Sequence, residues 1–573
     1  MLNSTAAVHE PLLDGTLDAT TRPALLRGWR PLNPFSGVGR LPVVDSEHAL
    51  ETGKLFSERR AIEAALASLT EAWKQVDAVF GTFPATSVTQ ILLLKPIDLR
   101  HPFLFYMGHL PAFAWNRYNS RLLPEDALPI QPPLTLEMLS TFAKLFERGM
   151  DPDVDDPTRC HWHSQVPSTA EEWPPVFQVA AYRDYIRQDL SYRLRRWSES
   201  VDDQVLPPSS CYTLLMTIAE HEWMHTETLL YMLHQLNGYC MRPFWISEYR
   251  QQMQSLASAD ALPMDQNSSY PPLGATQRVE SDGIVSLGRN PHEVIEPYLR
   301  FAWDNELPRV QRKIPRSLLV QRYPVTNLQY WYFVQAGGYR ELDRYWLNES
   351  DRQWCARSGR QWPQFWRALN RSGQQQSGPA CYVVHPDGRL GEHALGEPAC
   401  VENHWPVYVT LAEARAFANW VSGALGNQRH PAATWRLPTE AEWQHLAEGA
   451  YPDSALDSDE SSESSADGNY GFRHWGPIST YESPNCSRWG VCDLVGNGWE
   501  WTESLFEPLD RERFQPSPLY PEYSADFFDD KHFVLKGASW ATGTPLVRST
   551  FRNWYQAHYP YVFAKFRLVC EEA

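Results

Sequence analysis

His221 and His225 lie one helical turn apart in the segment CYTLLMTIAEHEWMHTETLLYMLHQLNG (211–238). On a helix they share a face with Leu214 and Ile218, because these positions recur at spacings of three and four. Both imidazoles therefore point toward the interior of a helical bundle. Two imidazoles one turn apart on a buried face can bind one metal ion through their free nitrogens. The alternative is two core histidines, each hydrogen-bonded to a neighbour.

A metal ion needs a further ligand, and His109 is the best candidate. It lies in the apolar stretch YMGHLPAF, where a histidine costs desolvation unless it has a partner. A buried histidine bonded to a backbone carbonyl is the alternative. Glu227 is a poor ligand from the same helix, and His101, His161 and His163 lie in polar or Pro-flanked segments. The residues thus predict a three-histidine site, and histidine alone does not decide between zinc, copper and iron.

The pattern HEWMH also matches the H-E-x-x-H zinc motif of metalloproteases. Glu222 lies about 100° from His221 around an ideal helix, so it could act as a general base or as a supporting carboxylate. Zinc proteases take their third ligand from downstream of this motif, whereas His109 lies upstream. A zinc hydrolase is therefore the less favoured interpretation.

Long amphipathic patterns before residue 250 predict the elements that position these histidines. We expect helices over the stretches that begin near Ile62, Phe103 and Val179, and over 211–238, the last with Asn237-Gly238 as its C-cap signal. A kink is expected near Pro111. The predicted organisation is an extended segment at 1–50, a helical bundle at 51–254 and a linker at 255–279.

The residue pattern of the sequence changes after residue 280. Apolar runs become short, and Gly, Pro and Trp are frequent, so the segment 280–573 is predicted to be a second domain with little regular structure. The acidic, Ser-rich stretch 452–469 cannot bury apolar surface and is expected to be a disordered surface loop. The predicted fold class is α+β.

Bulk composition limits the possible partners. The net charge of −18, from 51 basic and 69 acidic residues, disfavours nonspecific binding to nucleic acid or anionic membranes. Neither a secretory signal nor a membrane-spanning run is found, which predicts a cytoplasmic protein. The nine cysteines contain no CxxC pair, and their odd count and wide spacing predict reduced thiols.

Several motifs resemble a known family. YMGHLPAF and HEWMHTETLL resemble the two halves of the iron site in DinB-like helical bundles. The later half resembles formylglycine-generating-enzyme (sulfatase-modifying factor) domains, which have a C-type-lectin-like scaffold. The matching pieces are YPVTNLQYWYFVQAGGY, WRLPTEAEW, DLVGNGWEWTES, VLKGASWAT and RNWYQAHYPYVFAKFRLV. The two domains in this order resemble the sulfoxide synthases of ergothioneine and ovothiol biosynthesis, the EgtB and OvoA types, over roughly residues 55–570.

The resemblance implies an enzyme that uses Fe(II), with O2 as co-substrate, to join a thiol sulfur to an imidazole carbon and oxidise that sulfur. It implies His109, His221 and His225 as iron ligands. The substrates it implies are hercynine, which is trimethylated histidine, with cysteine or a related thiol. No convincing pair of reactive cysteines is found after GNGWEW, so the second domain is expected to lack formylglycine-generating chemistry.

The resemblance also implies substrate contacts. Asn553 and Trp554 match the pair that faces the trimethylammonium group of hercynine, and Trp is the best cation–π partner for such a group. The proton-donating tyrosine is expected to be Tyr520 or Tyr523, with Tyr520 slightly favoured. A packing role is the alternative for Trp554 and for each tyrosine.

The chain departs from the family after the Asn-Trp pair. Enzymes that use γ-glutamylcysteine carry Asp and Arg at the positions of Tyr555 and Tyr559, so cysteine is the expected thiol. Arg552 and Arg567 could bind a substrate carboxylate or form structural ion pairs. No G-x-G cofactor loop is found, so a separate methyltransferase is expected in the pathway.

Three alternatives differ in substrate or class. The same chemistry on histidine would give 5-histidylcysteine sulfoxide, as in the ovothiol pathway, and a selenium donor would give selenoneine. A non-catalytic binding module would need neither a metal nor these three histidines.

Overall fold

The computed structural model describes most of the chain. The described residues are 58–83, 87–119, 134–200, 211–236, 273–290, 301–369, 377–381, 395, 400–425, 434–451, 468–474, 476–483 and 485–571. The predicted C-cap at Asn237-Gly238, the segment 1–50, most of the linker 255–279 and most of the acidic stretch 452–469 lie outside them. The predicted domain boundaries at 50 and 254 therefore stay predictions.

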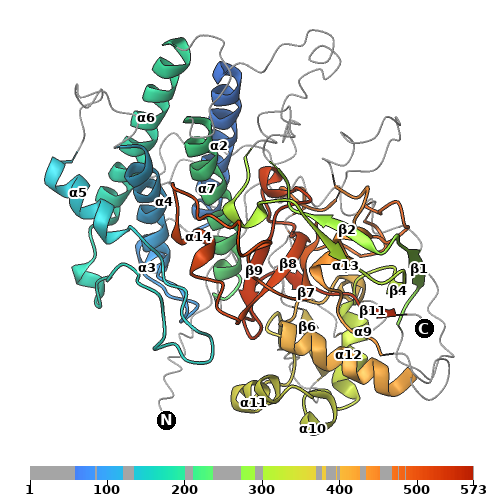
Figure 1. Ribbon diagram of the computed structural model, residues 1–573. Coiled ribbons are helices and arrows are strands. Elements are labelled where there is room, and N and C mark those ends of the chain that lie inside the picture. The colour runs from blue at the N-terminus through green and yellow to red at the C-terminus, as the bar shows by residue number, and fades with distance from the viewer. Residues whose placement is uncertain are drawn as a thin grey trace.

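Four long helices form a bundle in the first half of the chain. They are α2 (Glu58–Phe80), α4 (Phe103–Tyr118), α6 (Val176–Ser200) and α7 (Cys211–Leu233). Helix α2 packs against α6 and α7, and α4 packs against the same two helices (Figure 1). Two shorter helices, α3 (Val88–Leu92) and α5 (Leu136–Leu145), also pack against α4. The helices predicted from apolar spacing are confirmed.

The apolar faces of these helices form the bundle core. In α2 the predicted face residues Ile62, Leu69 and Val76 are buried, as the three- and four-residue spacing requires. Helix α4 is buried along almost its whole length, and it continues through Pro111. A helix this apolar, with Arg117 in its last turn as its one charged residue, is stable in water only because neighbouring helices cover it on several sides.

The second half is built from short strands. The strands are β1 (Thr276–Glu280), β2 (Ile284–Leu287), β3 (Val310–Lys313), β4 (Ser317–Gln321), β5 (Trp366–Leu369), β6 (Ser377–Cys381), β7 (Gly498–Leu505), β8 (His532–Ala538), β9 (Asn553–Gln556), β10 (Ala564–Lys565) and β11 (Val569–Glu571). A four-stranded sheet has the order β10-β7-β8-β9, and a three-stranded sheet has the order β1-β4-β11. Two hairpin-like pairs, β2-β3 and β5-β6, complete the described strands. All pairings are antiparallel except that of β10 with β7.

Short helices accompany these sheets. They are α9 (Asn327–Gln335), α10 (Leu342–Tyr345), α11 (Glu349–Ser358), α12 (Leu411–Leu425), α13 (Glu440–Leu446) and α14 (Glu522–Ala525). One of them, α13, packs against β2, β7 and β8. Thr326 and Thr439 begin α9 and α13 with capping boxes, which satisfy the first free N–H groups of each helix. Short strands and helices joined by long irregular segments confirm the α+β prediction.

The two halves share one continuous apolar core. Helix α7 forms much of their contact: the hydroxyl of Tyr523 on α14 lies 3.3 Å from the sulfur of Met224 on α7. Helix α7 also packs against the short 3-10 helix at Thr544–Leu546. The sheet edge at β9 and helix α14 thus lie beside the helix that carries two of the candidate ligands (Figure 1).

The prediction of reduced thiols is wrong for one pair of cysteines. Cys486 and Cys492 form a disulfide, and their residues also pair as an isolated antiparallel β-bridge. The backbone brings the two Cα atoms within 3.9 Å across a separation of only six residues, which counting cysteines along the chain could not reveal. No helix among the described residues has the length and apolar character needed to span a membrane.

Candidate metal centre and substrate cavity

His109, His221 and His225 meet in the bundle core. Helix α4 supplies His109, and α7 supplies His221 and His225 one turn apart, so the packing of α4 against α7 brings the three rings together. One ligand nitrogen of each lies within 4.8 Å of those of the other two. The ring centroid of His109 is 5.1 Å from that of His221 and 4.9 Å from that of His225.

A hydrogen bond to a backbone carbonyl fixes the orientation of the His109 ring. Its Nδ1 lies 2.8 Å from the backbone oxygen of Phe146, so the Nδ1–H donates to that carbonyl and the Nε2 lone pair remains for a metal. Gly108 permits this approach, because a Cβ atom there would lie 2.5 Å from the ring of Phe146. The carbonyl partner considered as the alternative to metal binding is therefore present, but it occupies only one ring nitrogen.

The three imidazoles are held neutral. Burial lowers the pKa of His109 to about 4, although the Phe146 carbonyl acts in the opposite direction. Burial also lowers the pKa of His221 and of His225 well below the usual value, with further lowering from neighbouring histidines. Neutral imidazoles keep the lone pair that a metal requires.

Two buried ring nitrogens test whether the three histidines suit a bound metal ion. Among the described residues, Nδ1 of His221 and Nδ1 of His225 have no hydrogen-bond partner. A buried polar atom without a partner is costly, and a bound ion at these rings would offset that cost. The phenyl ring of Phe113 stacks on His221 at 3.6 Å and fixes the plane of that imidazole. The residues present fit a divalent metal ion held by three histidines.

A cavity of about 200 Å³ opens beside the three histidines. Both halves of the chain line it. The bundle contributes the ligands and Arg100, and the second half contributes an aromatic wall that includes Trp499 and Phe527. A mostly aromatic cavity with a few charged groups is typical of a small-molecule site.

Most of the predicted substrate residues reach this cavity. Tyr520, Tyr523, Asn553, Trp554 and Tyr555 all line it. The neighbouring Tyr559 is buried behind them, with its ring stacked on that of Tyr555 at 5.0 Å.

Arg552 and Arg567 do not line the cavity. Arg552 is buried and donates to Glu440 at 2.7 Å and to the backbone oxygen of Glu507 at 2.9 Å. Arg567 is buried against Glu500, with Nε 2.8 Å from the carboxylate. The interpretation of either as a substrate-binding residue is therefore wrong: each forms a buried ion pair with a carboxylate of the protein, on α13 for Arg552 and on β7 for Arg567.

Glu222, the candidate general base of the zinc-protease interpretation, also faces away from the cavity. Its carboxylate accepts a hydrogen bond from the indole N–H of Trp73 on α2 at 3.2 Å. The carboxylate thus braces two bundle helices and does not face the three histidines.

Glu227 has a supporting role between the two halves. Its carboxylate accepts hydrogen bonds from the Trp499 indole at 2.9 Å, the Ser539 hydroxyl at 2.7 Å and the Thr542 hydroxyl at 2.9 Å. Since Glu227 lies two residues from His225, these three donors fix the rotation of α7 at the ligand pair.

Sequence reasoning missed Arg100, Asp151 and Tyr231, which all line the cavity. Arg100 lies three residues before the first residue of the apolar helix α4, where a buried charge is unusual, and this was the one available signal. Asp151 lies in an irregular segment, and no sequence pattern relates it to Arg100 in space.

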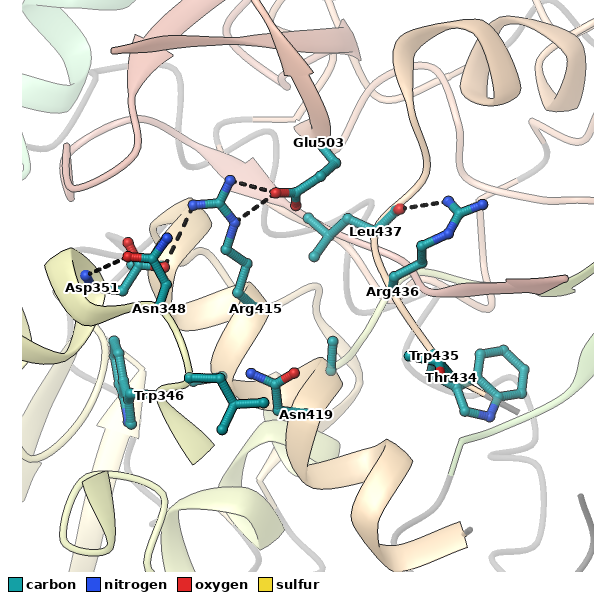
Figure 2. Close-up of a pocket in the computed structure, with 14 residues that line it drawn as sticks. Trp346, Asn348, Asp351, Arg415, Asn419, Thr434, Trp435, Arg436, Leu437 and Glu503 are labelled. Atoms are coloured by element: carbon teal, nitrogen blue, oxygen red, sulfur yellow. Dashed lines mark hydrogen bonds and ion pairs between the residues drawn. The ribbon is translucent and has the colours of Figure 1, made fainter. Parts of the chain in front are cut away.

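A second cavity, of about 310 Å³, lies in the later half. Figure 2 shows Arg415 bridging Asp351 and Glu503 within it, while Arg436 contacts the backbone oxygen of Leu437. Its lining contains neither histidine nor cysteine, Arg415 pairs with Asp351 and Glu503 within it, and Arg436 pairs with Glu442 outside it. Of these two cavities in the described part of the chain, the histidine-lined one is therefore the candidate site.

The fold and site define a class: a protein with a three-histidine centre in a helical bundle, closed by a second domain rich in aromatic residues. The model of the sulfatase-modifying factor enzyme 1-like domain matches residues 277–572, and the chain belongs to this family.

Curated relatives share both halves. The chain is 28% identical to Ergothioneine biosynthesis protein 1 of Neurospora crassa, over 83% of this chain and 55% of the relative. The values for the protein of the same name from Schizosaccharomyces pombe are 28%, 82% and 52%. It is 30% identical to Hercynine oxygenase of Mycolicibacterium thermoresistibile, over 61% of this chain and 67% of the relative. The chain spans about half the length of the two fungal relatives.

Proposed function

We propose that the chain catalyses an Fe(II)- and O2-dependent coupling of hercynine with cysteine to form a sulfoxide. One C–H bond of the imidazole and the S–H bond of cysteine break, and a C–S bond and an S–O bond form. One O2 accepts four electrons and provides the sulfoxide oxygen and one water. The observation that carries the proposal is the cluster of three neutral histidines beside a cavity lined by Trp554 and Tyr520.

His109, His221 and His225 would hold the metal. Bound Fe(II) would supply the redox chemistry that O2 requires and would favour the thiolate form of a thiol ligand. The protein itself excludes water, since the rings of Phe113 and Tyr106 lie against the histidines. An apolar wall of this kind strengthens every charge interaction in the cavity.

The aromatic wall suits a quaternary ammonium group. Trp554 is half-buried and lines the cavity, and Phe506 stacks on it at 4.2 Å. The Tyr523 ring lies 5.0 Å from it in an edge arrangement. Several π-faces around one end of a cavity attract a cation that cannot donate hydrogen bonds, which supports hercynine over histidine.

Tyr520 is the proposed proton donor. Its ring centroid lies 6.2 Å from that of His221 and 5.1 Å from that of Phe113. Burial raises the pKa of Tyr520, so the phenol stays protonated at any pH near neutrality. A neutral O–H close to the ligand cluster can deliver a proton to a developing anion.

The name of the bacterial relative, Hercynine oxygenase, supports hercynine as the imidazole substrate. A methyltransferase acting on histidine would then be the reaction that supplies it, and we propose that this activity is separate from the described domains. Enzymes that use γ-glutamylcysteine carry Asp and Arg at the positions of Tyr555 and Tyr559. The two tyrosines cannot form the ion pairs that those side chains would form with a γ-glutamyl group, which supports cysteine as the thiol.

The test begins without oxygen. The protein is loaded with Fe(II), mixed with cysteine and either hercynine or histidine, and exposed to air, and the product is identified by mass spectrometry. We expect hercynylcysteine sulfoxide from the wild type, with bound iron and product both lost in His221→Ala. His163→Ala is the matched control, because that histidine lies outside the cavity. Preferred coupling of histidine, or unchanged product in His221→Ala, would contradict the proposal.

A further inference from the structure

Two oppositely charged side chains line the cavity together. Arg100 is 7% exposed, and its Nη1 donates to the Oδ1 atom of Asp151 at 2.6 Å. Both residues belong to the cavity wall. A buried guanidinium next to a carboxylate in a small-molecule cavity places a positive and a negative group at one position.

Each side chain of the pair keeps one polar atom that makes no hydrogen bond to any residue that the structure describes. Nε of Arg100 donates to the Tyr231 hydroxyl at 3.1 Å, and Nη1 donates to Asp151 and to the backbone oxygen of Leu99 at 3.0 Å. Within the described chain, no hydrogen bond involves Nη2 of Arg100 or Oδ2 of Asp151. The free atoms are therefore two N–H groups and one carboxylate oxygen.

The surroundings hold the pair rigidly. The Arg100 guanidinium lies 4.9 Å from the centre of the Tyr559 ring, and Tyr559 stacks on Tyr555. Burial alone would lower the pKa of Arg100, but Asp151 and the nearby tyrosines hold it well above its ordinary value. A fixed, permanently charged guanidinium is a strong partner for a carboxylate.

The other arginine of the cavity has a different arrangement. Arg148 pairs with Asp526, and Asp526 does not line the cavity. Arg148 therefore offers positive charge to a ligand without a matched carboxylate. Only the Arg100 pair presents both charges among the described residues of the wall.

We infer that Arg100 and Asp151 form a subsite for the α-carboxylate and α-ammonium groups of an amino-acid substrate. Arg100 receives the carboxylate through Nη2, and Asp151 accepts from the ammonium through Oδ2. A trimethylated amine cannot donate to Asp151, so the subsite selects the thiol substrate and not hercynine. The assignment to cysteine rests on the proposed function, whereas the zwitterion subsite itself rests on the free atoms of the pair.

The test uses three thiols that differ by one group each. L-cysteine has both charges, cysteamine lacks the carboxylate, and 3-mercaptopropionate lacks the ammonium. Their dissociation constants for the Fe(II)-loaded protein are measured by calorimetry without O2. We expect the wild type to bind cysteine most tightly, by roughly 10- to 100-fold over each analogue, as for hydrogen bonds between charged groups.

Two variants separate the two contacts. Arg100→Met should lose the preference for cysteine over cysteamine, and Asp151→Asn should lose the preference for cysteine over 3-mercaptopropionate. Arg344→Met, which changes an exposed arginine of α10 outside the cavity wall, should keep both preferences. If Arg100→Met does not fold, as judged by circular dichroism, Arg100→Lys takes its place and should lose most of the first preference, because a point charge cannot reproduce the fork of Arg.

The inference is overturned if the wild type shows no preference for cysteine, if the Arg100 and Asp151 variants keep their preferences, or if Arg344→Met abolishes them. The proposed function can fail separately. Altered preferences without any sulfoxide product would support the subsite and contradict the synthase, whereas product formation with unaltered preferences would do the reverse.

Discussion

Tyr520 and Tyr523 lie on the same short segment, yet their hydroxyl groups have different surroundings. The Tyr523 ring stacks on Trp303 at 3.9 Å, and its hydroxyl contacts the sulfur of Met224. Tyr520 instead lies against Phe113 and under the guanidinium of Arg117, 5.0 Å from its ring centre. The packing of Tyr523 indicates a structural residue, and the position of Tyr520 beside the ligand cluster indicates a proton donor.

Replacing each tyrosine by phenylalanine tests this distinction. Tyr520→Phe should lower kcat for sulfoxide formation by roughly 100-fold or more, the usual contribution of a positioned general acid. Tyr523→Phe keeps the stacked ring and should change kcat by no more than about threefold, since only a weak O–H to sulfur contact is lost. Steady-state kinetics with a product assay measure both. A larger effect at Tyr523 would reverse the assignment.

For single residues, the sequence predicted the convergence of the three histidines better than the residues that line the cavity. The histidines follow helical spacing, so their convergence can be read from one helix and one apolar stretch. Arg552 and Arg567 show the limit: an arginine near a motif can bind either a substrate or the protein, and only the positions of Glu440 and Glu500 decide. Arg100 and Asp151 are 51 residues apart and meet only in the folded chain.

Among the elements, the loop at residues 148–156 connects the cavity to the second half of the chain; we call it the clasped loop. Its first residues, including Asp151, line the cavity. Its later residues are held by Gln556 at the end of β9, whose side chain accepts from the Val154 N–H at 2.8 Å and donates to the Pro152 oxygen at 3.0 Å. His558 adds a contact of 2.6 Å to Asp155.

Gln556→Ala should release the clasped loop. Loss of two hydrogen bonds is worth about 1–3 kcal/mol. We expect faster amide hydrogen exchange across residues 148–156 and a KM for cysteine raised severalfold, because Asp151 is no longer held in place. Gln353→Ala is the matched control, since that side chain bonds only to the exposed Glu349 on its own helix. Unchanged exchange in Gln556→Ala would show that other contacts hold the loop.

The elements themselves were predictable where periodicity is long. Helices α2, α4, α6 and α7 each present a repeated apolar spacing, and all four form. The later strands are two to eight residues long, too short for a periodic pattern to identify, and their order β10-β7-β8-β9 joins segments far apart in the chain. The pairing of Cys486 with Cys492 could not be predicted for a different reason: a local turn brings the two residues together, and cysteine spacing along the chain does not reveal it.

Across the whole molecule, a buried charge cluster joins the bundle to the second half. Arg548 donates to Glu220 on α7 at 2.7 Å and also pairs with Glu306. The Trp303 indole donates to Glu220 at 2.7 Å. Removing one partner from such a cluster leaves a buried charge uncompensated, which is strongly destabilising. The cluster therefore links the folding of the ligand helix to that of the second half.

The stability of the protein should depend on pH through Glu306. Burial alone would raise the pKa of Glu306, but Arg548 outweighs it and lowers the pKa from 4.5 to about 2. A depressed carboxyl pKa contributes stability above the unfolded-state pKa and loses it as pH falls toward the folded-state value. The contribution is about 3 kcal/mol, lost between roughly pH 4.5 and pH 2.

Denaturant unfolding at several pH values measures this contribution. Glu306→Gln should be less stable near neutral pH and should lose less free energy of unfolding between pH 5 and pH 2 than the wild type. Glu349→Gln, on the exposed surface of α11, should follow the wild-type profile. If the free energy of unfolding varies with pH in the same way for the wild type and Glu306→Gln, the ion pair of Glu306 with Arg548 does not contribute to the pH dependence.

The most direct test of the proposed O2-dependent coupling of hercynine with cysteine follows the oxygen atoms. The Fe(II)-loaded protein, hercynine and cysteine are mixed without air and then supplied with O2 enriched in oxygen-18, while O2 uptake and product are recorded. We predict that one O2 is consumed per coupled product and that the sulfoxide of the product contains one heavy oxygen. A coupled thioether without heavy oxygen, or O2 uptake without any carbon–sulfur product, would contradict it.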